Sequence, residues 1–167
     1  MVHSDTEELN RQREQFEERF RGEVTWREGT AEAVPGWYEQ LLTDLVLATG
    51  PEPIKYFSAK FVPTQEDAPG SMAVVAFTND LVTYANLDGL SPDDATSLEV
   101  VVMARRSLSS FSLETLGEEP IGSTKDIRVT VQYPGFSRSL PLAESDWHKR
   151  DSEISELITH LRRDLVA

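Results

Sequence analysis

The feature that most constrains this fold is a series of short alternating stretches between residues 54 and 142. In the first stretch the apolar side chains recur at every second position, so that Phe57, Ala59 and Phe61 share one face. Seven such stretches follow one another, at residues 54–62, 72–77, 81–87, 98–104, 108–116, 127–133 and 136–142. Because most connections are short, the strands are predicted to pair antiparallel, and an antiparallel sheet of this size usually curls into a sandwich or a barrel.

Two of the connections carry the residues of tight turns. Thr78, Asn79 and Asp80 separate the second and third stretches and predict a hairpin. Pro134 and Gly135 separate the last two stretches in the same way.

The end of the chain is the clearest predicted helix. Behind a cap at Asp151 or Ser152, apolar residues recur with helical spacing. This apolar stripe consists of Ile154, Leu157, Ile158, Leu161 and Leu165. We expect the stripe to cover the open end of the barrel or sandwich.

Two further helices are predicted before the strands. Ser4 and Glu7 form a capping box for the first, which ends near Gly22 and carries three apolar residues on one face, Leu9, Phe16 and Phe20. Because three residues are few, we expect a chain without residues 1–22 to keep a folded core. The second helix begins at Pro35, ends at Gly50 and carries Trp37, Leu41, Leu45 and Ala48.

The predicted fold class is therefore α+β, with an antiparallel seven-stranded barrel or sandwich capped by a C-terminal helix and two N-terminal helices added. The predicted division is an N-terminal helical extension at residues 1–53, packed on the core, and a β domain with its C-terminal helix at residues 54–167. An α+β fold of another type, with a different sheet order and the helices on one face, stays open.

Three stretches carry a resemblance to a known family. Residues 76–82 are similar to the hairpin of bacterial pleckstrin-homology-like domains, and residues 127–133 and 139–142 are similar to their last strands. With the order of elements, residues 54–166 resemble this family, in which seven strands in two crossed sheets are capped by a final helix. The two N-terminal helices lie outside the family pattern.

The resemblance implies a lipid headgroup site only where the first inter-strand loop is basic, because phosphates need close positive charge. Here residues 63–71 contain no Lys or Arg, and neither do residues 88–97. No phosphoinositide binding is therefore expected, and the resemblance implies instead a rigid platform for peptide or protein contacts.

Composition narrows the choice of partners and compartment. The 29 acidic residues outnumber the 16 basic ones, so the net charge is −13, which disfavours nucleic acid and membrane surfaces as partners. The chain has no cysteine, no signal peptide pattern and no apolar stretch of membrane-spanning length, so a cytoplasmic location is predicted.

The residues that carry chemistry do not form a recognisable site. His3, His148 and His160 lack metal-ligand spacing, although His148 follows Asp146 in a polar loop where it could act as a base. No nucleophile motif and no phosphate-binding glycine loop is present, and the acidic pairs 93–94 and 118–119 lack calcium-loop spacing. The prediction is a non-enzymatic chain with no catalytic, cofactor-binding or metal-binding residue and no cofactor.

Two groups of residues are candidate contact points. Arg105 and Arg106 are adjacent between two predicted strands, where a solvated turn is the favoured interpretation and contact with an acidic partner or loop is the alternative. Trp26, Trp37 and Trp147 could anchor a partner, and core packing is favoured for Trp37.

Three functions follow as hypotheses. The first is a non-enzymatic protein-interaction or self-association module, which could form a homo-oligomer. The second is an acidic binder of one basic protein, such as a secretion chaperone or an immunity-type protein, since the net charge would attract a basic target. The third is a small-ligand carrier or an enzyme that uses the barrel interior.

Overall fold

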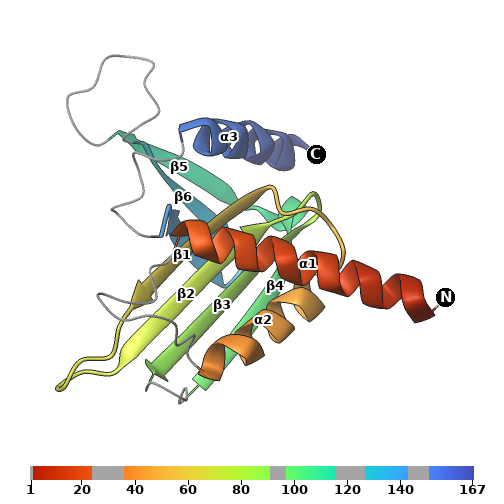
Figure 1. The fold of residues 1–167 in the computed structure, drawn as a ribbon. Coiled ribbons are helices and arrows are strands. Elements are labelled where there is room, and N and C mark those ends of the chain that lie inside the picture. The colour runs from red at the N-terminus through yellow and green to blue at the C-terminus, as the bar shows by residue number, and fades with distance from the viewer. Residues whose placement is uncertain (1, 24–35, 91–96, 116–126, 143–150) are drawn as a thin grey trace. The chain divides into compact units, whose positions relative to one another are not determined.

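The structure is a computed structural model that describes residues 2–23, 36–90, 97–115, 127–142 and 151–167 (Figure 1). This part of the chain is α+β, with three α-helices, one short 3-10 helix and seven strands in two antiparallel sheets. The elements are α1 (Val2–Glu23), α2 (Gly36–Thr49), β1 (Tyr56–Val62), β2 (Gly70–Phe77), β3 (Leu81–Leu90), β4 (Ser97–Ala104), η1 (Arg105–Ser107), β5 (Ser110–Thr115), β6 (Ile127–Tyr133), β7 (Phe136–Leu140) and α3 (Asp151–Val166).

The seven predicted strands and their antiparallel pairing are confirmed. The strands form a four-stranded sheet of order β1-β2-β3-β4 and a three-stranded sheet of order β5-β6-β7, so the described strands form no single closed barrel. The chain divides into two compact units, Met1–Val102 and Met103–Ala167. This division follows internal contacts, and the boundary between residues 53 and 54 stays a prediction.

Alternation sets the register of the four-stranded sheet. Ala59 lies opposite Val74, which lies opposite Ala85, and all three belong to one core cluster. The predicted turn between β2 and β3 is closed by a hydrogen bond from the Thr78 N–H to the Leu81 carbonyl, 3.0 Å. A slip of one residue would move each apolar set to the other face, so burial of this face fixes the pairing.

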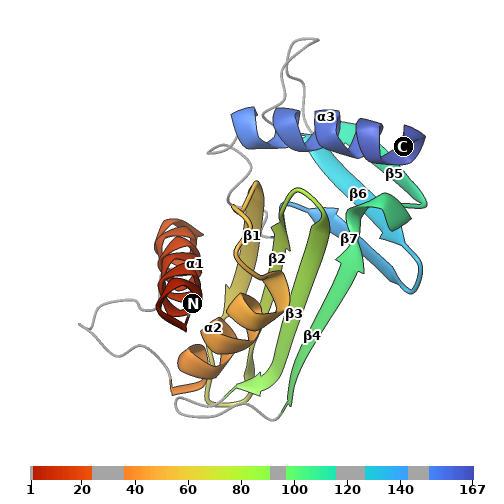
Figure 2. The ribbon, with the colours of Figure 1, turned by 90° about the vertical axis from the view of Figure 1, so that its right-hand side faces the viewer.

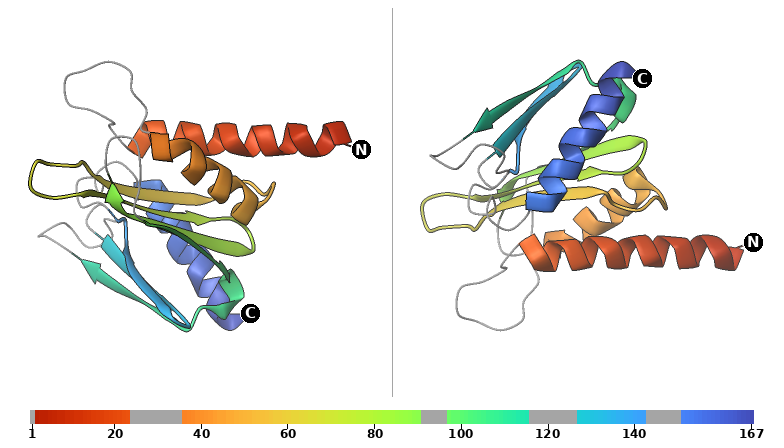
Figure 3. Two further views of the ribbon diagram at one scale, coloured as in Figure 1. Left: turned by 90° about the horizontal axis from the view of Figure 1, so that it is seen from below. Right: turned by 90° about the horizontal axis from the view of Figure 1, so that it is seen from above.

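The two N-terminal helices cover one face of this sheet (Figure 3). Phe20 of α1 is fully buried and packs edge to face on Phe57 of β1 and Tyr38 of α2, with ring centroids 5.0 and 5.4 Å apart. Phe16 is also fully buried and lies 6.2 Å from the Phe57 ring. Trp37 is buried, which confirms its predicted place in the core.

The sequence interpretation of α1 was wrong about where the helix begins, and one residue of the predicted face is not buried. The helix begins at Val2, so Ser4 lies inside it and does not cap its start. Leu9 is 41% exposed, although it shares a predicted face with Phe16 and Phe20. The N-terminal end of α1 extends beyond α2 and the sheet, and no described helix or strand of the same unit covers it (Figure 3).

The second unit contains the three-stranded sheet and α3. Three of the five predicted stripe residues, Ile154, Leu157 and Leu161, are buried, whereas Leu165 is 42% exposed. Gly135 adopts a φ of +76° in the turn between β6 and β7, a conformation that glycine reaches without a steric penalty. None of the described helices is long and apolar enough to cross a membrane.

Candidate functional site: a groove between α1 and α2

An open groove lies between the two N-terminal helices, all within the first unit. Its volume is about 170 Å³, and its lining is mostly apolar. α1 contributes Leu9, Asn10 and Arg13, and α2 contributes Leu42, Thr43, Val46 and Leu47. Leu9 and Leu47 are 41% and 68% exposed, so this groove presents apolar side chains to the surface.

The composition of α2 explains the exposed leucine. Its residues 41–48 include five aliphatic residues besides Ala48, which is too many for a single buried face. Four of them belong to the buried core cluster, and Leu47 is left on the outside. The four are Leu41, Leu42, Leu45 and Val46. Sequence analysis missed this residue because the predicted stripe of α2 described only the buried face.

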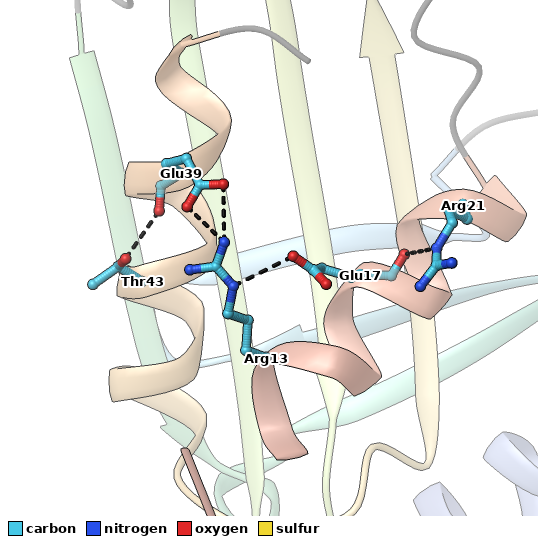
Figure 4. Close-up of polar contacts among 5 residues, drawn as sticks. All are labelled: Arg13, Glu17, Arg21, Glu39 and Thr43. Atoms are coloured by element: carbon cyan, nitrogen blue, oxygen red, sulfur yellow. Dashed lines mark hydrogen bonds and ion pairs between the residues drawn. The ribbon is translucent and has the colours of Figure 1, made fainter. Parts of the chain in front are cut away.

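The polar end of the groove is an ion-pair network (Figure 4). Arg13 Nη2 lies 2.9 and 2.6 Å from the two carboxylate oxygens of Glu39, and Arg13 Nε lies 3.3 Å from Glu17 Oε1. The Thr43 hydroxyl donates to the Glu39 carbonyl, 2.9 Å, and Arg21 Nε donates to the Glu17 carbonyl, 3.3 Å. The hydrogen bonds that Arg13 donates to Glu39 raise the pKa of Arg13.

Polar contacts also hold α1 against the segment that precedes β1. The buried side chain of Gln12 donates to the Glu52 carbonyl, 3.0 Å, and Gln15 accepts from the Ile54 N–H, 3.3 Å. Arg19 donates to the Ile54 carbonyl, 3.3 Å. These contacts and the two buried phenylalanines fix one wall of the groove on the core.

The surface around the groove is acidic. α1 carries seven Asp and Glu residues against four Arg, and α2 carries two acidic residues and no basic one. Three of the four Arg side chains, at positions 13, 19 and 21, donate to acceptors of the protein itself. Arg13 pairs with carboxylates, whereas Arg19 and Arg21 donate to backbone carbonyls and keep their full charge. Because acidic residues outnumber basic ones nine to four on the two helices, the apolar groove lies within an acidic surface.

A buried ion pair lies in the second unit. Arg105 Nε lies 2.9 Å from Asp164 Oδ2, and Arg105 Nη2 lies 3.1 Å from Asp164 Oδ1. Arg105 is 4% exposed, so the solvated turn that the sequence favoured for it was wrong, and only Arg106 is exposed. The pair joins η1 to the last turn of α3 and has a structural role.

Two titratable side chains lie close to this pair. The Tyr133 hydroxyl is buried and has no hydrogen-bond partner in the described part of the chain, and burial together with Asp164 raises its pKa. Burial and the charges of Arg105 and Arg163 lower the pKa of His160. His160 is half-buried on α3 and has no nucleophile or metal ligand set beside it within the described residues.

The remaining sequence candidates are not brought together. His3 lies in the first turn of α1. Trp26, His148, Trp147 and the acidic pairs 93–94 and 118–119 lie outside the described residues. Among the residues that are described, no three His, Cys, Asp or Glu side chains group in a way that could hold a metal ion.

The chain was compared with known proteins in three ways. No family model, no curated protein and no solved structure matches it.

Proposed function

We propose that this chain is a non-enzymatic protein-interaction module that binds a basic, amphipathic segment of a partner protein in the groove between α1 and α2. The observation that carries the proposal is the exposed leucine pair, Leu9 and Leu47, at an open groove within an acidic surface. A partner helix with apolar anchors on one face and Lys or Arg beside them complements both properties.

Charge favours this partner over an acidic one. Glu17 and Glu39 both contact Arg13, the one basic residue that lines the groove, so this cluster of three side chains keeps a net negative charge. The whole chain carries −13, which would speed association with a basic target and slow it with an acidic one.

Several features of the fold support a finer proposal, that residues 54–166 adopt a pleckstrin-homology-like arrangement. Four antiparallel strands are followed by three more and by a final helix, and consecutive strands are neighbours in both sheets. An experimental structure in which the two sheets do not pack face to face would refute this arrangement. Such a fold serves in this proposal as a rigid support for α1 and α2.

The proposal is tested by fluorescence anisotropy with labelled model peptides. The probe is an amphipathic helical peptide of Leu and Lys, and its controls are the same pattern in Leu and Glu and a scrambled Leu and Lys sequence of equal charge. We expect only the amphipathic basic peptide to bind tightly, with an affinity that falls as salt is added.

Substitution then locates the site. Leu47→Gln removes an exposed apolar side chain without adding charge, and we expect it to weaken binding about tenfold, since burying a leucine contributes about 1.5–3 kcal/mol. Val166→Gln is the matched control, because Val166 is 85% exposed and lies in the other unit. Equal loss in both variants, or equal binding of the scrambled peptide, would refute the groove as the binding site.

A further inference from the structure

The four-stranded sheet ends in β4, whose outer edge pairs with no other strand among the described residues. On its inner side β4 pairs with β3 (Figure 2). A strand edge of this kind presents a row of N–H and C=O groups that can accept a further strand.

The sequence of β4 lacks Lys and Pro, two of the usual defences against such pairing. Its eight residues are SLEVVVMA, with Glu99 as the single charge and without Pro, Gly, Lys or Arg. Every residue of the strand is at least partly exposed, and Val102 is 43% exposed. Natural edge strands are commonly blocked by an inward-pointing Lys, a Pro or a bulge.

The other end of the sheet differs in this respect. β1 carries Lys60, an exposed basic residue in its middle, and is followed by Pro63. Lys60 is therefore a barrier to strand addition at β1, and β4 is the edge on which a second strand would pair.

We propose that β4 is a self-association edge, on which β4 of a second copy of this chain pairs antiparallel across a two-fold axis. The two sheets would then form one continuous sheet of eight strands. Because each copy offers one unprotected edge of this sheet and the pairing consumes both, the assembly closes as a dimer. This interface shares no residue with the groove between α1 and α2.

The register of β4 makes it self-complementary. Leu98 and Val100 pack against the core cluster, so even-numbered side chains face the helices and odd-numbered ones face the opposite side. A two-fold axis perpendicular to the sheet at Val100 places Leu98 opposite Val102 of the second copy. It also places Glu99 opposite Val101 of the second copy, whereas a parallel in-register pair would set Glu99 against Glu99 and be repelled.

The experiment is size-exclusion chromatography with light scattering over a range of concentrations and salt. We expect a mass that rises from 18.8 kDa toward twice that value with concentration. Added salt should strengthen the dimer, because it screens the repulsion between two chains of −13 each. A mass that stays at 18.8 kDa at every concentration would overturn the proposal.

Substitution and hydrogen exchange locate the interface. Val102→Lys places a charge on the edge, and we expect it to raise the dimer dissociation constant at least about tenfold. Its melting temperature should equal that of the unmodified chain at concentrations where both are monomeric. Leu113→Lys on β5, at a residue that is 51% exposed, is the matched control. In the unmodified chain, amides of β4 should exchange more slowly as concentration rises, and those of β1 should not.

Two outcomes would contradict this interface. A dimer that Leu113→Lys disrupts and Val102→Lys does not would place the contact on β5. A dimer whose β4 amides exchange at the same rate at all concentrations would exclude strand pairing at β4. Both results leave the groove proposal standing, because the peptide assay measures that site separately.

Discussion

Phe20 provides the sharpest test of how α1 is attached to the first unit. The side chain is fully buried and packs edge to face on Phe57 and Tyr38 at centroid distances of 5.0 and 5.4 Å. Truncation of a buried phenylalanine to alanine costs about 3–5 kcal/mol, and the two ring contacts place Phe20→Ala toward the upper part of this range. Against a total stability of about 5–15 kcal/mol, the loss is a large fraction.

The assay is thermal unfolding followed by circular dichroism, with urea unfolding at 25 °C as the second measure. One kcal/mol shifts the melting temperature by roughly 2–4 °C in a chain of this size, so Phe20→Ala should melt about 6–20 °C lower. Leu9→Ala is the matched control on the same helix, because Leu9 is 41% exposed, and its free energy of unfolding should change by less than about 0.5 kcal/mol.

A melting temperature of Phe20→Ala within about 2 °C of the unmodified chain would refute the place of α1 in the core. The same contacts determine what happens when residues 1–22 are removed. The sequence suggested that a folded core would remain, but Phe16 and Phe20 lie in the main core cluster. From the structure we expect this truncation to be strongly destabilising.

Four further predictions concern other parts of the chain. Leu161→Ala should destabilise the chain by about 2–5 kcal/mol in urea unfolding, because Leu161 is fully buried, whereas Leu165→Ala, at a residue that is 42% exposed, should have a small effect. Arg105→Ala should cost about 3–5 kcal/mol by leaving Asp164 unpaired, and replacing both residues with apolar ones should recover most of the loss if the pair is structural. Burial raises the pKa of Tyr38 to about 12, above its ordinary value of 10.0. The stability linked to its neutral form should therefore be complete below pH 10 and lost as the pH rises through 12. In an absorbance titration, a Tyr38→Phe variant should lack a late tyrosine transition that the unmodified chain shows. Vesicles that contain phosphoinositides should not sediment the protein even at low ionic strength, and salt-sensitive sedimentation with them would show that a basic surface exists outside the loops at residues 63–71 and 88–97.

The sheets are the part of this fold that the sequence determines most directly. In a half-buried strand every second side chain faces the core, so the alternation shows which residues are buried. The turn at Thr78 is predicted from the Thr78 side chain and from the turn residues that follow it. The division into four and three strands could not be predicted in this way. Alternation records which residues share a face but not which strands end a sheet.

The helices show why periodicity alone is insufficient. A helical stripe gives the angle at which side chains leave the helix, but not how far along its axis the helix stays in contact with the core. Leu9 has the correct angle, but it lines the open groove beside α2 and stays 41% exposed. Leu47 was missed because it does not belong to the buried stripe of α2. A prediction of the core considers only the buried stripe and therefore does not identify an exposed leucine beside it.

The buried ion pair was beyond the reach of local patterns. Arg105 and Asp164 are 59 residues apart, so no spacing rule connects them. Two adjacent arginines between strands are typical of a solvated turn, and only tertiary contact with α3 reverses that expectation for Arg105. Charged residues that are buried in pairs are the class for which sequence reasoning gives the wrong environment.

The net charge of −13 has opposite consequences at the two proposed interaction surfaces, and this makes them separable in one titration. Binding of a basic segment at the groove gains from the charge, so salt weakens it. Pairing of two β4 edges brings two acidic chains together, so salt strengthens it until screening is complete. If a physiological partner bound at the groove, its positive charge would reduce the repulsion between copies, and β4 pairing would tighten without any change of shape. The two surfaces would then be coupled through electrostatics alone, with a coupling that disappears at high ionic strength.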